Sequence, residues 1–170
     1  MTVASSTHEQ FHSDSIMRVV NVAHENDVLH ILPYAYYCVV RVSGRRTLEH
    51  KEGDTDWKTK ATCLVGGNRL RREMMETSHS FLFDFRPSQL CHSRECAYAR
   101  GVHDERRALE AGPLSPLRRY TRWHELHVCR ECVAYCQLRH SVGRQKMWSK
   151  LPSFFGMLTW DELKSVMPAT

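Results

Sequence analysis

Four cysteines in the second half of the chain are spaced as two pairs. Four residues separate Cys91 from Cys96, two residues separate Cys129 from Cys132, and 32 residues lie between the pairs. A Cys-x2-Cys turn that opens a helix brings two sulfurs within reach of one metal ion, and structural zinc binds four ligands in a tetrahedron, with sulfur at about 2.3 Å. Nearby arginines favour the thiolate form that binds metal. We therefore predict that these four cysteines bind one structural Zn²⁺.

Two alternatives to this ligand set are open. In the first, another sulfur or an imidazole replaces one of the four cysteines. The closest substitute is Cys136, because it lies one helical turn beyond Cys132 and on the same side of the helix. The imidazole candidates are His92, His127 and His140. In the second alternative the cysteines are buried or reduced free thiols that bind no metal.

The sequence contains no convincing catalytic motif. Four thiolates around zinc leave no open coordination position, so such a site stabilises a fold rather than catalysing a reaction. His124 and His127 are three residues apart, whereas the metalloprotease motif places its two histidines four residues apart. The Cys-x2-Cys pair lacks the strand and helix pattern of a redox motif, and no phosphate-binding or dinucleotide-binding glycine motif is present. We therefore predict no enzymatic activity, and a thiol or metal enzyme is the weakest alternative.

Basic residues are concentrated around the cysteines. Residues 1–85 carry a net charge of −1, residues 86–150 carry +7 and residues 151–170 carry −1. A positive field of this kind attracts nucleic acid or an acidic partner. Glutamates are interspersed among these arginines, which is typical of a solvated helix face. A protein–protein interaction module is therefore our first functional hypothesis, and a nucleic-acid-binding regulatory protein that uses residues 94–144 is the second.

The composition is that of an intracellular globular protein. Apolar residues make up 42% of the chain and charged residues 25%, which is ordinary for a folded domain. The N-terminus has no apolar secretory segment, and no run approaches the 18 or so apolar residues that span a bilayer. Without export, seven cysteines are more typical of metal ligands and buried thiols than of a disulfide framework. We expect a nuclear or cytoplasmic protein with no membrane partner.

Helical periodicity dominates the chain and predicts an all-α fold. Residues 1–15 are predicted to be a disordered tail, and residues 16–168 a single irregular helical domain whose cysteine clamp and C-terminal tail occupy residues 91–165. Apolar residues recur at i, i+3, i+4 and i+7 from Ile16 onward, as on one buried helix face. Pro33 then starts a second helix that extends to Val42, since proline is well tolerated in the first turn of a helix.

Breakers and caps delimit the remaining predicted elements. Residues 43–56 are charged and predict a loop. Residues 57–65 predict a short helix that stops at Gly66-Gly67, because consecutive glycines favour a break. We expect further helices from residue 68 to the Arg86-Pro87-Ser88 break, from 91 to about 111, and from 129 to about 150.

The C-terminal tail is aromatic and carries a capping motif. Thr159 and Glu162 match a capping box, in which each side chain bonds the other residue's backbone N–H, so a short terminal helix is expected to follow. Phe154, Phe155 and Trp160 lie around this motif. These three rings either pack back on the domain or bind a partner protein. Packing back is favoured, because exposing so much aromatic area lowers solubility.

The order of these blocks resembles the region that follows the BTB fold in fungal, mostly basidiomycete, BTB/POZ-domain-containing proteins. The resemblance covers about residues 16–165. It is carried by residues 20–37 with their Leu-Pro entry, by the two cysteine pairs, and most specifically by residues 143–163. In the family the BTB fold precedes this region, whereas only the short tail precedes residue 16 here. The resemblance implies an adaptor-like helical module with a protein partner, and it is consistent with a zinc site.

Overall fold

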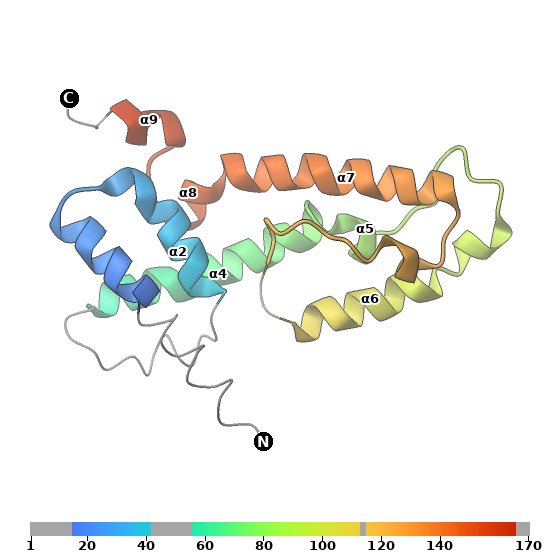
Figure 1. The fold of residues 1–170 in the computed structure, drawn as a ribbon, viewed down its shortest axis with the longest axis horizontal. Coiled ribbons are helices and arrows are strands. Elements are labelled where there is room, and N and C mark those ends of the chain that lie inside the picture. The colour runs from blue at the N-terminus through green and yellow to red at the C-terminus, as the bar shows by residue number, and fades with distance from the viewer. Residues whose placement is uncertain (1–14, 42–55, 113–114, 166–170) are drawn as a thin grey trace, which may run out of the picture. The chain divides into compact units, whose positions relative to one another are not determined.

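The computed structural model describes residues 15–41, 56–112 and 115–165. Every regular element among them is helical and none is a strand, which confirms the predicted all-α class (Figure 1). A first helix spans residues 15–25, so Ser15 belongs to it, while the rest of the predicted tail lies outside the described residues. The later helices are the 3-10 helix η1 (Leu29–Ile31), α2 (Leu32–Val40), α4 (Trp57–Glu76), α5 (Ser80–Phe83), η2 (Arg94–Ala97), α6 (Arg100–Ala111), η3 (Trp123–Leu126), α7 (Arg130–Ser149), α8 (Leu151–Phe154) and α9 (Trp160–Ser165).

The chain divides into two compact units. The terminal unit combines residues 1–69 with residues 150–170, and the central unit comprises residues 70–149. A single domain over residues 16–168 stays a prediction, since the compactness of each unit does not say whether the two fold together.

In the terminal unit, α4 passes through Gly66-Gly67 without a break, so the predicted helix stop is wrong. A Cβ at Gly66 would overlap the ring of Phe155, and one at Gly67 would touch Val40. The two glycines are therefore sites of close packing between helices, and this burial offsets their low helix propensity. Asp56 starts the helix, because its carboxylate accepts a 2.6 Å hydrogen bond from the Thr59 backbone N–H.

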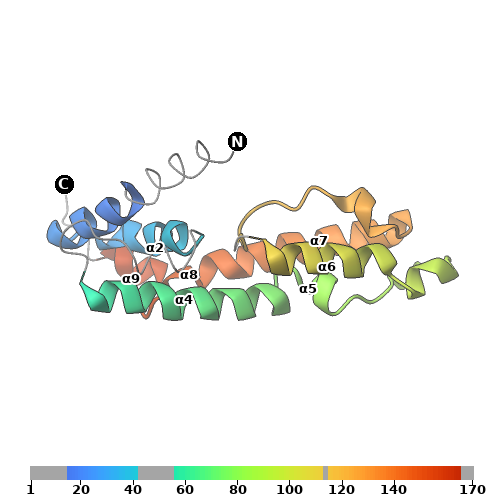
Figure 2. The ribbon, with the colours of Figure 1, turned by 90° about the horizontal axis from the view of Figure 1, so that it is seen from below.

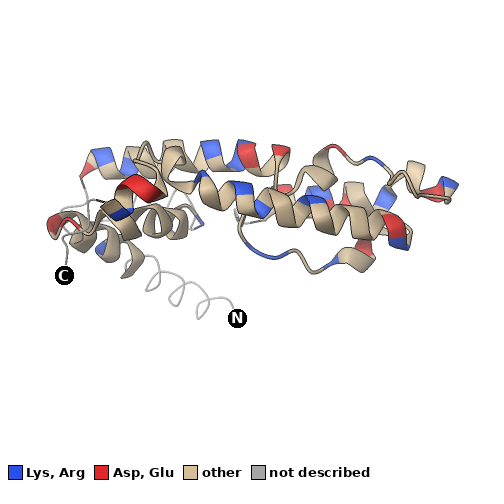
Figure 3. Cartoon of the chain, turned by 90° about the horizontal axis from the view of Figure 1, so that it is seen from above, with Lys and Arg blue, Asp and Glu red and all other residues tan. Residues whose placement is uncertain are grey.

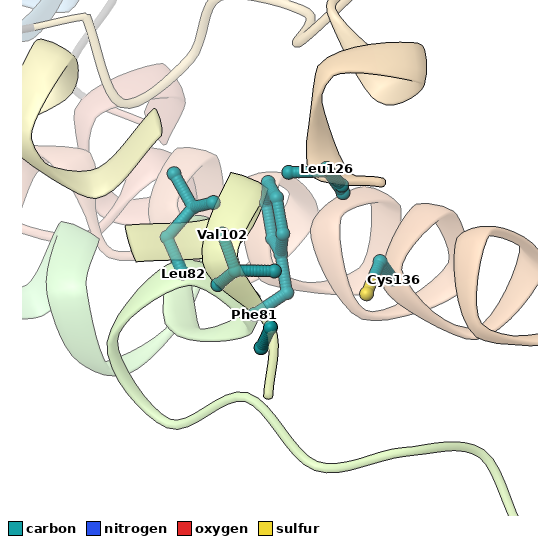
Figure 4. Packing of buried hydrophobic residues seen from close by; sticks show 6 residues of the cluster. Phe81, Leu82, Val102, Leu126 and Cys136 are labelled. Atoms are coloured by element: carbon teal, nitrogen blue, oxygen red, sulfur yellow. The ribbon is translucent and has the colours of Figure 1, made fainter. Parts of the chain in front are cut away.

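In the central unit, α5 contacts both α6 and α7 (Figures 1 and 2). Their shared apolar core is shown in Figure 4 and consists of Phe81, Leu82, Ala99, Val102, Leu126 and Cys136. Leu126 is contributed by η3, which packs on α6. The core therefore joins four segments, three of which are single short helices that could not be stable alone.

The predicted helix from residue 68 is wrong, because residues 68–76 continue α4 and a turn at residues 77–79 separates α4 from α5. The long helix after the second cysteine pair begins at Arg130 and ends at Ser149. The segment from Cys91 is not one helix, however: η2 is separated from α6 by Ala99, which has a positive φ of 44°. This turn matters for the cysteines, because it redirects the chain immediately after the first pair. The predicted charged loop, apart from Asp56, lies outside the described residues.

Candidate metal centre

The four predicted cysteines meet at one point in the central unit. Their Sγ atoms all lie within 4.8 Å of one another. Cys91 precedes η2 and Cys96 lies within it, while Cys129 directly precedes α7 and Cys132 occupies its first turn. The Cys91 and Cys129 sulfurs are 3.7 Å apart, close to the edge of about 3.8 Å that a zinc tetrahedron with bonds of about 2.3 Å requires. The arrangement fits one zinc-sized ion bound by four sulfurs.

Backbone N–H groups already point at two of these sulfurs. The Cys129 N–H donates to Cys96 Sγ at 3.2 Å, and the Ser88 N–H donates to Cys132 Sγ at 3.4 Å. Hydrogen bonds of this kind orient metal ligands and stabilise thiolates. The N-terminus of α7 adds partial positive charge beside Cys129 and Cys132. The surroundings therefore favour deprotonated sulfur.

The pKa values of the two buried cysteines, Cys96 and Cys132, are shifted in opposite directions. Burial raises the pKa of Cys132 well above its ordinary value. Burial also acts to raise the pKa of Cys96, but hydrogen bonds from Cys129 outweigh it and the net shift is downward. The pKa of one thiol thus lies below its ordinary value and that of a close neighbour lies above it, because hydrogen bonds prevail at Cys96 and burial prevails at Cys132. A divalent cation removes this conflict by neutralising the thiolates together.

Close backbone packing positions the second pair against the first. A Cβ on Gly101 of α6 would overlap the backbone of Glu125 and Leu126 in η3. Only glycine allows this approach without a shift. The chain then turns at His127, with a φ of 49°, before entering α7. Gly101 and the His127 turn together bring residues 127–132 to the cysteines that precede α6.

The proposed substitute ligands lie outside this group. Cys136 is buried in the apolar core instead, and the four residues that separate it from Cys132 place it about 6 Å further along α7. His140 is buried and bonded on both ring nitrogens: Nδ1 lies 2.6 Å from the Ser78 carbonyl, and Nε2 accepts from the Tyr120 N–H at 3.0 Å. His92 and His127 are exposed and are not members of the four-sulfur group.

The aromatic tail lies in the terminal unit. Phe154 and Phe155 are buried there, and Phe155 stacks on Tyr36 with ring centroids 5.1 Å apart. These two rings therefore pack inside the unit and do not offer a surface to a partner in this structure, as the packing-back alternative expects. Trp160, at the start of α9, is half-buried. A partner contact by Trp160 stays a prediction.

A buried polar network in the central unit was not foreseen. Glu105 is buried on α6 and accepts a 2.7 Å hydrogen bond from the Tyr120 hydroxyl, while Arg122 pairs with its other oxygen at 2.7 Å. Burial, followed by the Glu105 carboxylate, raises the pKa of Tyr120. The sequence did contain a signal: Glu105 falls between Val102 and Leu109 in an apolar stripe, where a carboxylate needs a partner.

Among the described residues, no helix has both the length and the apolar character that crossing a bilayer requires. Resemblance to the post-BTB region stays a prediction carried by the motifs alone. Compared with known proteins, the chain matches no family model, no curated protein and no solved structure.

Proposed function

We propose that the chain is a non-enzymatic protein–protein interaction module whose central unit is held together by one structural zinc ion. The observation that carries the proposal is the convergence of four cysteine sulfurs within 4.8 Å. Four thiolates fill a zinc coordination shell, so the ion would stabilise the fold and have no position for a substrate. The resemblance to the post-BTB region of fungal proteins adds the expectation of an adaptor-like role.

Two large side chains beside the cysteines favour a partner surface at the metal centre. Leu90 directly precedes Cys91 and is 68% exposed, and Tyr98 follows Cys96 by two residues and is 75% exposed. Exposed apolar side chains next to a rigid site are typical of protein interfaces, in which tyrosine is also enriched. A zinc ion that fixes both flanking cysteines would hold these two side chains in place for a partner.

Metal analysis tests the core of this proposal. The purified protein is expected to contain about one zinc per chain, and Cys129→Ser is expected to lose the metal and to unfold or aggregate. Cys136→Ala is the matched control, because Cys136 is a buried cysteine of α7 that lies outside the four-sulfur group. This variant should keep its zinc. A chain that purifies folded without any metal would contradict the proposal.

Thiol labelling separates a closed structural site from a reactive one. In the native zinc-loaded protein, Cys129 and Cys132 are expected to react slowly with iodoacetamide and to become reactive after a chelator is added. Rapid labelling of both thiols before chelation would indicate exposed thiolates, which a thiol enzyme needs and a closed site does not have.

Nucleic-acid binding is the second candidate, and one observation favours it. The exposed Tyr98 lies between Arg94 and Arg100, which are also exposed, and an aromatic ring among arginines can stack on an unpaired base. Acidic residues are interspersed with basic ones in the central unit (Figure 3), which favours the protein partner. In a filter-binding assay, nucleic-acid binding would weaken steeply with salt, and Tyr98→Ala would reduce it. If the partner is a protein, Leu90→Ser would instead abolish binding of that protein.

A further inference from the structure

The exposed face of α7 carries an apolar stripe. Tyr135, Leu138 and Val142 are 37%, 63% and 42% exposed. Their spacing of three and four residues places them on one side of the helix. The core-facing side of the same helix is buried and consists of Cys132, Cys136, His140, Gly143 and Met147. The helix thus has a second apolar side, which no other described segment of the central unit covers.

A groove lies along this stripe. It has a volume of about 370 Å³, and its walls include Leu138 and Val142 on one side and Thr77 and Ser80 on the other. Gly143 also lines the groove and lets α7 lie close to the backbone of Thr77 and Ser78, because a Cβ there would overlap them. The stripe therefore has a recess beside Val142 that a large side chain can enter.

Opposite charges flank the stripe. Glu131 lies one helical turn before Tyr135, and Lys146 lies one turn after Val142, on the same side of α7. Both side chains are exposed. The Glu131 carboxylate interacts with the Cys129 thiol and with the nearby charges of Arg130 and His92, whereas Lys146 forms no ion pair with another described residue. With a rise of about 1.5 Å per residue, they are about 22 Å apart along the helix. The order along this face is acidic, aromatic, aliphatic, aliphatic, basic.

This order is self-complementary when the same face of two copies comes together with the two α7 helices antiparallel. The midpoint between Glu131 and Lys146 is also the midpoint between Tyr135 and Val142, and it falls beside Leu138. Two antiparallel α7 helices would place each Glu131 opposite a Lys146, each Tyr135 opposite a Val142, and the two Leu138 side chains together at the centre. Such matching of one patch with itself is the property of a twofold interface.

We propose that this face of α7 binds a second copy of the chain, with the two α7 helices antiparallel and centred on Leu138. Tyr135 of one copy enters the groove beside Val142 of the other, and two symmetric ion pairs close the ends. The contact is confined to one helix and its groove, so the buried area is at the low end of specific interfaces and the dimer is expected to have a micromolar Kd.

Arg139 lies near the centre of the proposed contact. The Arg139 side chains of the two copies would therefore lie close together, and their like charges could oppose pairing. Its guanidinium is already engaged within each copy. It donates to the Asp84 carbonyl at 3.0 Å, lies 4.0 Å from the Asp84 carboxylate, and sits over the Tyr135 ring at 5.8 Å. The Asp84 carboxylate therefore balances the charge, and Arg139 helps to hold Tyr135 in the stripe.

Charge reversal tests both the surface and the register. The oligomeric state of the full chain is measured by sedimentation equilibrium over a range of protein concentrations. Glu131→Lys alone and Lys146→Glu alone are each expected to raise the dimer Kd about tenfold, since each creates two like-charge contacts. The double variant restores both pairs with opposite polarity and is expected to return within about threefold of the original Kd. Leu138→Ser should raise the Kd more than either single reversal.

Controls keep these outcomes distinct from a loss of folding. Leu158→Ser removes a similarly exposed leucine that lies outside the stripe, and it should leave the dimer Kd unchanged. Because Glu131 lies between two of the cysteines, zinc content and thermal melting are measured for every variant. Lys146 lies far from the metal centre, so Lys146→Glu tests the surface without disturbing the metal ligands. A chain that is monomeric at all concentrations would overturn the proposal. So would a double variant weaker than both single variants, or a dimer unaffected by Leu138→Ser.

Discussion

The two units of the molecule are stabilised in different ways. The terminal unit buries apolar and aromatic side chains, among them Met17, Val20, Tyr36 and Phe155, and a glycine pair lets its helices approach closely. The central unit also has an apolar core, but it buries the charged Glu105 and two histidines, and its cysteine segments are joined by short 3-10 helices and irregular chain. Apolar burial can stabilise the first arrangement by itself.

The cysteine segments of the central unit need a further source of stability. Ordering an irregular segment costs backbone entropy without the intrahelical hydrogen bonds that a long helix returns. Buried polar groups such as Glu105 contribute little net stability even when they are fully paired. A metal ion that joins two segments separated by 32 residues would supply the missing free energy, because binding and folding are then one process. The comparison therefore predicts that metal dependence is confined to the central unit.

Removing the metal is expected to have the largest effect. A chelator at neutral pH, or Cys132→Ser, should unfold much of the central unit, since structural zinc contributes on the order of 10 kcal/mol in small zinc modules. Residues 16–40 of the terminal unit should keep their protection. Hydrogen exchange read peptide by peptide measures both units in one sample. Equal loss of protection in both units would contradict the comparison, because it would mean that the two fold as one body.

The terminal unit should respond instead to its aromatic packing. Phe155→Ala removes a buried ring that stacks on Tyr36 and fills the space beside Gly66, and large-to-small changes of this kind cost about 3–5 kcal/mol. Protection of residues 16–40 should fall while zinc content stays at its original value. Leu158→Ala is the control, since Leu158 is exposed in the same unit and its loss should cost well under 1 kcal/mol.

The features that could be predicted from sequence are those fixed by local spacing. The cysteine pairs were recognisable because a short loop and a helix start bring the sulfurs of each pair together whatever surrounds them. Thr159 and Glu162 form the expected capping box, with the Glu162 carboxylate accepting from the Thr159 N–H at 2.8 Å. In both cases the interacting atoms are a few residues apart, so the sequence contains the whole geometry.

The features that could not be predicted depend on a distant partner. Gly66-Gly67 reads as a helix break until Phe155, far along the chain, is known to pack against it. Cys136 has the spacing of a ligand, and only the core formed by α5, α6 and η3 shows that its sulfur is buried among apolar side chains. The stripe on α7 was likewise hidden, because a helix with two apolar sides gives no clear periodicity.

Mild acid should weaken the central unit through its buried histidines. Burial, with smaller contributions from His140 and Arg144, lowers the pKa of His79 to about 3, whereas an unfolded histidine titrates near 6.5. Below about pH 6.5 the unfolded state therefore binds a proton that the folded state does not, and stability falls by about 1.4 kcal/mol per pH unit for this group. Urea unfolding at pH 7 and pH 5.5 measures the change.

The same experiment needs variants, because acid also protonates cysteine ligands. His79→Gln keeps a polar partner for the buried Ser78 hydroxyl, which lies 3.0 Å from the His79 Nδ1, and it should remove part of the pH dependence. His124→Gln is the matched control, since the His124 side chain is 79% exposed. If both variants lost stability with pH as steeply as the original chain, His79 would not be the group that titrates.

The smallest predicted effect is at the cap of α9. The Thr159 hydroxyl accepts from the Glu162 N–H and donates to the Glu162 carboxylate, so Thr159→Ala removes both hydroxyl bonds, at a cost of about 1 kcal/mol. The bond from the residue 159 backbone N–H to that carboxylate is kept. Because α9 is only six residues long, the loss should appear as faster amide exchange in residues 160–165 and not as a change in the main unfolding transition. Thr159→Ser retains the hydroxyl and should exchange at nearly the original rate. If alanine and serine exchanged alike, α9 would be held by the burial of Leu163, and apolar packing would then stabilise even the end of the terminal unit.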